Sequence, residues 1–458
     1  MLLASPGVAH VCHSQIKEVN AVKANDGVHS GETAIAVDPT DSEHLMAAFV
    51  YLKGGVRHLG YAFSTDGGNT WPDTGYFSFT GVDPSCGFDE DRNAYYAYIR
   101  LDSSIYVSKR VQGSWLDPTY VASGGDKPYM AVDNNDDNVR DGYIYVAWTK
   151  KTDIGFTPKF SYSTDGGSSF SNPKIVDDPP GGDFVAPIGA VPAVGESSDV
   201  YLTWARIDAQ ADVETVDVCF NKWEVGDTFF VQGSIKELAD VDDGLWFEPL
   251  GGCGLRIAAL PTIAVDTSKA GDDYIYVAYT QHKSNDEEDY DIYYVRSTDG
   301  GDSWSGASSA VAYNSSKEFF PWLTVTPLGK ICLAFVTNLH CSGSCADLYL
   351  AHGTTMSSLD TLAITSDCKL SGAGYYDYIG IASSLGFAYP CWTQKLDDDA
   401  DVYMAIVDFP PSKPAKPSVA DSACGAYLTW DANPENDIDY YEVWRKIKYS
   451  KYNQTPWR

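Results

Sequence analysis

The chain has 458 residues, and its 32 Lys and Arg residues against 63 Asp and Glu residues give a formal net charge of −31. Hydrophobic residues make up 44% of the chain and charged residues 21%, a globular composition that excludes disorder for most of the chain. Nucleic-acid binding needs Lys and Arg to neutralise phosphates, so the acidic balance argues against a nucleic-acid partner and disfavours anionic membranes. At about 150 residues per domain the length predicts about three domains, although all-β domains run longer as single units.

The cysteines and the N-terminal residues bear on the cellular compartment. No run of about 18 apolar residues is present, which predicts that no segment inserts into a membrane. Residues 1–10 lack the features of a secretory signal, so we expect a removed signal or a fragment. The ten cysteines lack zinc-ligand spacing, and they are either scattered buried thiols or include a few disulfides formed in an oxidising compartment. Cys341 and Cys345, in the loop CSGSC, are the best local candidates for disulfide formation, and the sequence leaves the pairing of the cysteines open.

Three segments are near copies of one another. They are STDGGNTW at 64–71, STDGGSSF at 163–170 and STDGGDSW at 297–304. Each follows an alternating stretch that is typical of a strand, so each is predicted to form a hairpin turn. In such a turn the Ser and Asp side chains hydrogen bond to nearby backbone groups, Gly supplies the positive φ angles, and the final Trp or Phe packs under the sheet.

These three turns resemble the Asp-box, or BNR repeat, of the sialidase superfamily. The resemblance implies an all-β fold, a sialidase-like β-propeller. It also implies that each Asp-box lies on the hairpin between the third and fourth strands of a blade, away from the active face. The three segments therefore indicate the fold and not a catalytic site.

A second phrase recurs seven times, an apolar strand followed by a strand rich in Tyr, Val, Ala and Trp. Its copies begin with TAIAVD at 33–38, PSCGFD at 84–89, PYMAVD at 128–133, PIGAVP at 187–192, PTIAVD at 261–266, PWLTVT at 321–326 and DYIGIA at 377–382. Each copy suits the innermost strand of a blade, so seven blades are favoured and six, the number in sialidases, are the alternative. The last unit ends near Phe409 with three clear strands, and we expect 16–22 to supply its fourth strand and close the ring.

The composition changes after Phe409, which divides the chain into a propeller over 1–409, a Pro-rich linker over 410–417 and a second module over 418–458. The second module resembles the opening of a fibronectin type III domain, with Trp430 as its core Trp and 441–445 as its third strand. Only half of such a β-sandwich fits before Arg458, so we expect a truncated module that is poorly stable alone.

Chemistry in a propeller is expected at the axis, where the first strands converge. The residue before each phrase is here called its lead residue, and the seven are Glu32, Asp83, Lys127, Ala186, Leu260, Phe320 and Tyr376. A pair of carboxyl groups at the axis is what a glycosidase needs, one as acid and the other as base or nucleophile. We therefore predict catalytic roles for Glu32, Asp83, Tyr376 and Asp377, and ligand binding by Asp126, Lys127, Arg256, Glu318 and Tyr378. The alternative is that these acids are only hydrated or hold an ion.

Known sialidases combine a Tyr nucleophile, a Glu partner, an Asp acid/base, three Arg and an early Phe/Tyr-Arg-Ile-Pro motif. That motif is absent here, and the nearest string is LRIA at 255–258, in the fifth unit instead of the first. Arg256 is therefore only a ligand-binding candidate, and the ten Arg residues do not assemble into a triad. These departures argue against sialidase activity itself.

A metal hypothesis concerns the loop that follows the third phrase. Asp133, Asn135 and Asp137 have the alternate-residue spacing of a calcium loop, but the loop lacks its Gly at position six and its Glu at position twelve. A solvated loop is the alternative to calcium. No other cofactor is expected.

Two functions remain open. The first is a glycan-recognising or adhesion module of a larger secreted or cell-surface protein, with a carbohydrate or a cell-surface glycoprotein as its partner. The tandem modules, the supply of Tyr and Trp, and the missing Arg triad favour it. The second is an exo-glycosidase of sialidase type with its site at the axis.

Overall fold

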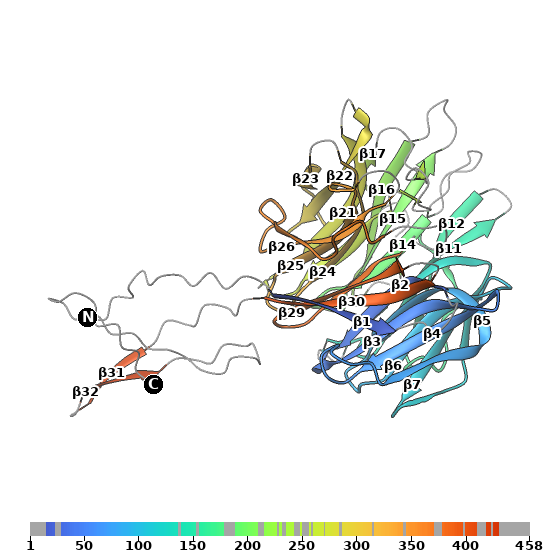
Figure 1. Ribbon diagram of the computed structural model, residues 1–458, viewed down its shortest axis with the longest axis horizontal. Coiled ribbons are helices and arrows are strands. Elements are labelled where there is room, and N and C mark those ends of the chain that lie inside the picture. The colour runs from blue at the N-terminus through green and yellow to red at the C-terminus, as the bar shows by residue number, and fades with distance from the viewer. Residues whose placement is uncertain are drawn as a thin grey trace.

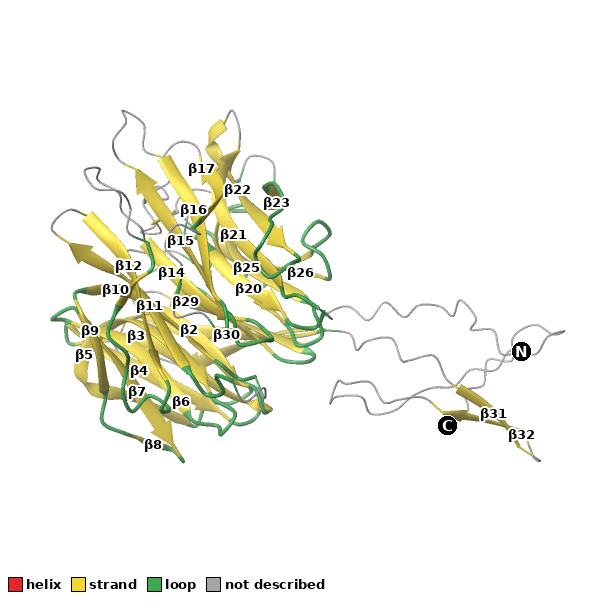
Figure 2. Ribbon diagram, turned by 180° about the vertical axis from the view of Figure 1, so that it is seen from behind, coloured by secondary structure: helices red, strands yellow, loops and turns green. Residues whose placement is uncertain are grey.

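The computed structural model describes residues 15–22, 29–135, 139–152, 155–177, 188–208, 215–226, 229–230, 235–241, 248–249, 256–257, 260–269, 271–283, 286–313, 316–341, 345–370, 378–396, 399–409, 418–422 and 425–429. The regular elements in these ranges are all strands (Figure 2). None of the described segments forms a helix that is long and apolar enough to cross a membrane. The chain is therefore an all-β protein in its described part, and its sheets are arranged as a β-propeller (Figure 1).

Twelve strands form one continuous sheet, which brings the two ends of the propeller together. They are β1 (Gln15–Val22), β2 (His29–Asp38), β3 (Asp41–Lys53), β4 (Val56–Ser64), β5 (Asp73–Phe88), β6 (Ala94–Arg100), β7 (Ser104–Val111), β8 (Ser114–Trp115), β9 (Thr119–Ser123), β28 (Gly380–Ser383), β29 (Phe387–Leu396) and β30 (Asp399–Asp408).

Four further sheets have four antiparallel strands each, in chain order. The first two are built from β10 (Gly125–Val132), β11 (Ile144–Thr152), β12 (Gly155–Ser163) and β13 (Lys174–Ile175), and from β14 (Ile188–Val194), β15 (Val200–Asp208), β16 (Thr215–Trp223) and β17 (Lys236–Val241). The other two are built from β20 (Thr262–Asp266), β21 (Tyr274–Lys283), β22 (Asp286–Ser297) and β23 (Ser308–Val311), and from β24 (Glu318–Val325), β25 (Ile331–Thr337), β26 (Asp347–Gly353) and β27 (Asp360–Ala363).

Two short hairpins lie outside these sheets. They are β18 (Glu248–Pro249) with β19 (Arg256–Ile257), and β31 (Ser418–Ser422) with β32 (Gly425–Thr429). The second hairpin begins the module predicted over 418–458, while the linker 410–417, Trp430 and the strand predicted at 441–445 lie outside the described residues.

The number of separate sheets differs from the expectation. The seven repeated phrases favour seven blades, whereas the described residues form five hydrogen-bonded sheets of four or more strands. The difference has a backbone cause. β5 continues without a turn, pairing through 73–80 with β4 and through 81–88 with β6, and a parallel pair between His29 and Ala400 joins β2 to β30. Three groups of strands are therefore linked into one twelve-stranded sheet.

The N-terminal strand closes the propeller as predicted. β1 pairs antiparallel with β30, from Gln15 opposite Asp408 to Val22 opposite Val402. β1 thus lies beside the last strand of the propeller, as Figure 1 shows, and gives β30 a partner on its outer side. Pairing the first strand with the last removes an edge that would otherwise be open to aggregation.

The three repeated turns have the same hydrogen bonds. In the first, Ser64 Oγ donates to Asp66 Oδ1 at 2.8 Å and accepts from Gly68 N at 2.8 Å, while Thr70 N donates to Asp66 Oδ1 at 2.8 Å. The turns at 163–170 and 297–304 repeat these contacts, and the two Gly of each copy have positive φ. Each turn joins a third strand to a fourth, namely β4 to β5, β12 to β13 and β22 to β23. The prediction of hairpin turns is therefore confirmed.

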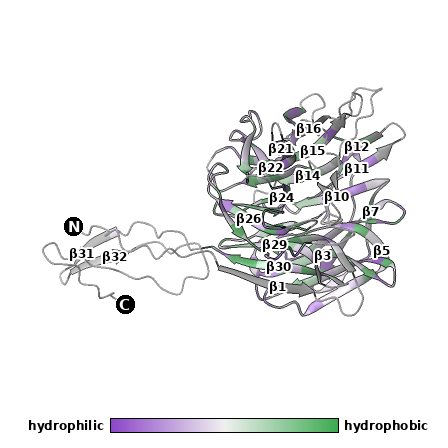
Figure 3. Ribbon diagram, turned by 45° about the horizontal axis from the view of Figure 1, so that its top comes forward, coloured by the Kyte–Doolittle hydropathy of each residue, from purple (hydrophilic) through white to green (hydrophobic). Residues whose placement is uncertain are grey.

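The core lies between neighbouring sheets. The second strand of each repeat is buried on both faces, as in β6 and β25, because each sheet is packed between two others. Trp148, Trp204 and Trp392 occupy this layer with no exposed surface. Figure 3 shows hydrophobic stretches along such packed strands.

One of the two candidate cysteines forms a disulfide, and the structure supplies the pairing that the sequence leaves open. Cys341 is bonded to Cys368, which is 27 residues further along the chain, and not to Cys345. Cys341 follows β25, whereas Cys368 lies in the connection from β27 to β28. The fold brings these two loops together, a contact that local spacing does not reveal.

Candidate functional site

Five first strands share a β-bulge near the point where they begin, whereas β20 and β28 pair with their second strands without a shift. The pairing with the second strand shifts between Gly31 and Ala34 in β2, and equivalent shifts occur in β5, β10, β14 and β24. In each bulge one residue has a left-handed backbone: Glu32 (φ 49°), Asp83 (φ 53°), Lys127 (φ 49°), Gly189 (φ 70°) and Phe320 (φ 51°). A left-handed conformation costs a non-glycine residue about 1–3 kcal/mol and occurs mostly at functional sites, where the surroundings hold it in place.

These bulges correct one lead residue. The sequence predicts Ala186 as the lead residue of the fourth phrase, but the left-handed residue of that strand is Gly189, and Ala186 lies outside the described residues. The phrase is therefore AVPAVG at 190–195, three residues later than PIGAVP. PIGAVP resembles the phrase PYMAVD in sequence, because both begin with Pro and continue with apolar residues. The pairing of β14 with β15, however, sets which residue occupies the lead position.

The three charged lead residues form a chain of hydrogen bonds from one first strand to the next. The amide of Asp83 donates to Glu32 Oε2 at 2.8 Å, and the amide of Lys127 donates to Asp83 Oδ2 at 3.4 Å. Each carboxylate therefore satisfies the backbone N–H of the next bulge. All three side chains are buried, with at most 9% of each residue exposed.

Tyr378 completes this network from the opposite end of the sequence. Its hydroxyl donates to Asp83 Oδ1 at 2.8 Å and accepts from Lys127 Nζ at 3.1 Å, and Lys127 Nζ lies 4.2 Å from the centroid of its ring. Tyr378 follows the last lead position and precedes β28, so closure of the propeller places it beside Asp83. Glu32, Asp83, Lys127 and Tyr378, called here the axial cluster, are thus brought together.

Burial shifts the proton equilibria of the axial cluster. Burial, and then the charge of Asp83, raises the pKa of Glu32 to about 7. The same two causes raise the pKa of the neighbouring Asp126. Burial also raises the pKa of Tyr378 well above its ordinary value, so its hydroxyl remains a hydrogen-bond donor at neutral pH. A carboxyl group with a pKa near 7 can both donate and accept a proton under physiological conditions.

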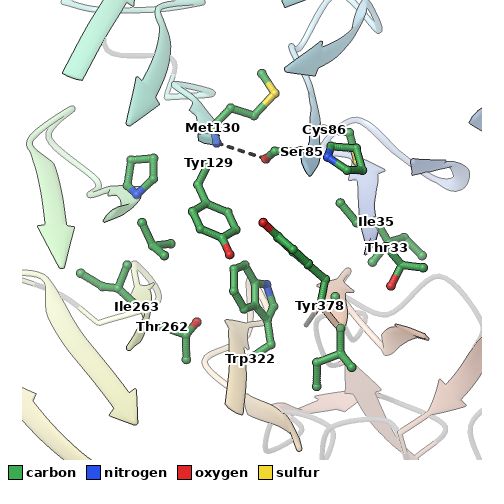
Figure 4. A pocket seen from close by; sticks show the side chains of 16 residues that line it. Thr33, Ile35, Ser85, Cys86, Tyr129, Met130, Thr262, Ile263, Trp322 and Tyr378 are labelled. Carbon is green, nitrogen blue, oxygen red and sulfur yellow. Dashed lines mark hydrogen bonds between the residues drawn. The ribbon is translucent and has the colours of Figure 1, made fainter. Parts of the chain in front are cut away.

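A cavity of about 180 Å³ lies beside the axial cluster and is lined by the first strands (Figure 4). Figure 4 shows Tyr129, Trp322 and Tyr378 converging on it, with ring centroids 5.2 Å apart for Tyr129 and Trp322 and 6.2 Å apart for Tyr129 and Tyr378. Three aromatic rings from β10, β24 and the segment before β28 therefore surround one small space.

Hydroxyl groups around the cavity connect neighbouring first strands. Ser85 Oγ accepts from the amide of Met130 at 3.1 Å, and Thr262 Oγ1 accepts from the amide of Leu323 at 3.2 Å. The wall of the cavity is therefore fixed by hydrogen bonds between strands, which keeps the aromatic rings in position.

Sequence reasoning missed Tyr129 and Trp322, although a signal for them exists. Both occupy the second position of their phrases, PYMAVD and PWLTVT, as Tyr378 does in DYIGIA. Ala34, Ser85 and Thr262 hold the same position in other phrases and also line the cavity. The second position therefore faces the axis, and aromatic residues there mark the cavity.

Other predicted site residues lie elsewhere or outside the description. Tyr376 and Asp377 lie outside the described residues, as does the side chain of Arg256, whose backbone forms β19. Glu318 does not join the axial cluster: its carboxylate accepts from Ser316 Oγ and Thr337 Oγ1 and lies with Asp289 and Asp291, their oxygens within 4.8 Å of one another. Burial raises the pKa of Glu318 to about 7. This buried trio has a geometry that could hold a cation.

The predicted calcium loop remains a prediction. Asp133 is buried, and its carboxylate accepts from the amide and the side-chain amide of Asn135, at 3.2 and 3.0 Å, and from Tyr145 Oη at 3.3 Å. These bonds show Asp133 organising the start of its loop. Asp137 lies outside the described residues.

Comparison with known proteins supports the fold. No family model matches the chain, and a search of curated proteins finds no match. Among solved structures the chain is similar to polysaccharide lyase Uly1, with a TM-score of 0.51, 10% identity, and coverage of 85% of this chain and 92% of that one. It is also similar to a protein of unknown function from Dyadobacter fermentans, with a TM-score of 0.49, 12% identity, and coverage of 86% and 99%.

A third similar structure is the Hadza microbial sialidase Hz136, with a TM-score of 0.45, 10% identity, and coverage of 83% of this chain and 66% of that one. At 10% identity the similarity to polysaccharide lyase Uly1 concerns the fold alone.

The raised pKa of Glu32 predicts a pH-dependent stability. The folded chain keeps the Glu32 proton up to a pH of about 7, whereas the unfolded chain releases it near 4.5, so this stabilisation is present below 4.5 and is lost as the pH rises through 7. Glu32→Gln should therefore flatten the decline in the free energy of unfolding between these pH values, by about 1–3 kcal/mol in total.

Urea denaturation at intervals of pH measures this effect, with the exposed Glu43→Gln as the matched control. Parallel pH profiles for wild type, Glu32→Gln and Glu43→Gln would contradict the burial of an acid at this position.

Proposed function

We propose that the chain is a glycan-recognising module that binds one sugar residue, or the end of a glycan chain, at its axis. The observation that carries this proposal is the cavity where Tyr129, Trp322 and Tyr378 converge beside Asp83 and Lys127. Aromatic walls with a few convergent polar groups are typical of ligand sites. The aromatic rings would stack on the apolar face of a sugar, and the polar groups would bind its hydroxyls.

The size of the cavity supports a small ligand. Its volume of about 180 Å³ is below the range of about 300–1,000 Å³ that is usual for drug-sized ligands. A single ring is therefore a better fit than an oligosaccharide enclosed along its length.

The charges beside the cavity support a neutral sugar. Glu32, Asp83 and Asp126 surround Lys127, and Arg57 acts on Glu32 through its charge. The carboxyl groups of this set outnumber its two cations, and Lys127 is already engaged by Tyr378. A sugar that carries a carboxylate would meet like charge here.

The proposal includes the cellular location of the protein and its partner. The disulfide between Cys341 and Cys368 supports a secreted or cell-surface location, where such bonds persist, and a cell-surface glycoprotein or free carbohydrate as partner. The fold shared with a polysaccharide lyase agrees with a glycan ligand.

We assign 418–458 to the start of a fibronectin type III module, and Asp133, Asn135 and Asp137 to a calcium site.

We also infer seven blades of sialidase type. The twelve-stranded sheet contains the strands of three four-stranded units, which begin at β2, at the second half of β5 and at β28, and four sheets are separate. The three turns that resemble Asp-boxes each follow a third strand, as that family predicts.

Removal of an aromatic wall tests the binding proposal. A glycan array with neutral and acidic sugars identifies the ligand, and calorimetry then measures its affinity for wild type and for Trp322→Ala. We expect an affinity loss of at least about tenfold for Trp322→Ala, because a stacking surface is removed.

The matched control for this experiment is Tyr76→Ala, which removes an exposed aromatic ring from β5 and should leave the affinity unchanged. Melting temperatures of both variants report on folding. An array without any sugar hit, or equal affinities of Trp322→Ala and wild type, would refute the proposed site.

An exo-glycosidase is the second candidate, and the pKa of Glu32 near 7 beside the Asp83 carboxylate favours it. Tyr376 and Asp377 remain predicted members of such a site. If the site hydrolyses aryl glycosides, Glu32→Gln and Asp83→Asn should each lower the rate at least about a hundredfold, while Glu43→Gln retains it. Absence of hydrolysis by wild type, or full activity of both variants, would exclude catalysis at the axis.

A further inference from the structure

Three cysteine sulfurs gather in the loops beside β25, β26 and β28. Cys341 and Cys368 form a disulfide, and the sulfur of Cys345 lies with theirs inside a group whose members are all within 4.8 Å of one another. Cys345 is not part of this disulfide, and all three residues are partly exposed. A third sulfur within reach of a disulfide is the arrangement that thiol–disulfide exchange requires.

The turn that carries Cys368 is held by several contacts. Asp367 (φ 65°) and Cys368 (φ 58°) are consecutive residues with a left-handed backbone, a conformation that persists only where the surroundings hold it. The buried carboxylate of Asp347 accepts from the amides of Cys368 at 3.1 Å and Lys369 at 3.2 Å, and from Thr365 Oγ1 at 2.8 Å. The disulfide is therefore the covalent member of a set of anchors on this turn.

The same turn leads toward the axial cluster. Leu370 is paired with Ala346 by two backbone hydrogen bonds, of 2.9 and 3.0 Å, and Tyr378 follows Cys368 by ten residues. Tyr378 in turn hydrogen bonds Asp83 and Lys127. The turn that carries Cys368 therefore stands at the start of the chain segment that ends at Tyr378.

We propose that Cys341, Cys345 and Cys368 form a thiol–disulfide exchange site. The thiolate of Cys345 attacks Sγ of Cys341, the bond between Cys341 and Cys345 forms, and the bond between Cys341 and Cys368 breaks. Cys368 leaves as a thiolate and takes up the proton that Cys345 released. The number of disulfides and thiols is unchanged, so the step needs no external oxidant or reductant.

The exchange interconverts two disulfide states, which anchor the turn at Cys368 differently. With Cys341 bonded to Cys368, the turn before the axial segment is tied to the loop after β25. With Cys341 bonded to Cys345, the covalent tie closes the local CSGSC loop, and Cys368 is held by its hydrogen bonds alone. The site therefore switches the anchoring of the segment that reaches Tyr378. This inference stands apart from the proposed glycan function, because both of its readouts are independent of any sugar.

Disulfide mapping of the full chain tests the exchange. The protein is purified without reductant, held at pH 6 and at pH 8.5, quenched in acid, and its remaining thiols are alkylated before mass spectrometry. In wild type we expect alkylation at both Cys345 and Cys368, approached faster at pH 8.5 because the thiolate is the attacking species. In Cys345→Ser we expect only the bond between Cys341 and Cys368.

Two further variants complete the test. Cys368→Ser should form a bond between Cys341 and Cys345, and the buried Cys332→Ser, on β25 and outside the trio, should map as wild type does. Alkylation of Cys345 alone in wild type at every time and pH would overturn the proposal. Two reactive thiols in a folded Cys368→Ser would also overturn it. Cys345→Ser keeps the disulfide seen here, so the test does not depend on the folding of Cys368→Ser.

Hydrogen–deuterium exchange tests the change in anchoring. Peptides that cover 369–380 should take up deuterium faster in Cys368→Ser than in Cys345→Ser, at least about threefold in rate, while peptides from β11 and β15 remain unchanged. Equal uptake over 369–380 in the two variants would refute the link between the cysteines and the axial segment.

Discussion

The left-handed bulge in the first strands β2, β5 and β10 is the constraint on which the axial site depends. First strands converge on the axis of a propeller, and a bulge turns the lead side chain away from the regular alternation of the strand. Glu32, Asp83 and Lys127 all adopt this backbone although none is glycine. The cost of three such conformations is offset because each carboxylate accepts the amide of the next bulge, which links neighbouring first strands.

This arrangement explains why Glu32 and Asp83 are buried, although acidic side chains are usually exposed. Asp83 serves the amide of Lys127 through one oxygen and the hydroxyl of Tyr378 through the other. The same burial raises the pKa of Glu32 to about 7, so structure and proton chemistry at the axis have one origin. The aromatic rings next to this cluster then add the apolar surface that a hydroxyl-rich ligand needs on one of its faces.

Turn chemistry and strand alternation made much of the fold predictable. The Ser, Asp and Gly of the turn at 64–71 act through local hydrogen bonds, which makes the turn recognisable from the sequence. A propeller must also close into a ring, which predicts that the N-terminal strand β1 pairs with the last strand. The site was less predictable because a positive φ at Glu32 leaves no mark in the sequence. The pairing of Cys341 with Cys368 depends on the contact between two loops that are distant in the sequence. The position of Gly189 in its strand depends on the pairing of β14 with β15, and the resemblance of PIGAVP to the other phrases does not reveal it.

The central claim is that the axial cavity between Tyr129, Trp322 and Tyr378 is a sugar site. A crystal structure of the full chain with the sugar that it binds best tests this claim most directly. The account predicts one sugar ring stacked against these aromatic side chains, with a hydroxyl in hydrogen-bond distance of Tyr378, Asp83 or Lys127. A sugar found only on the outer strands, with the axial cavity filled by water alone, would contradict it.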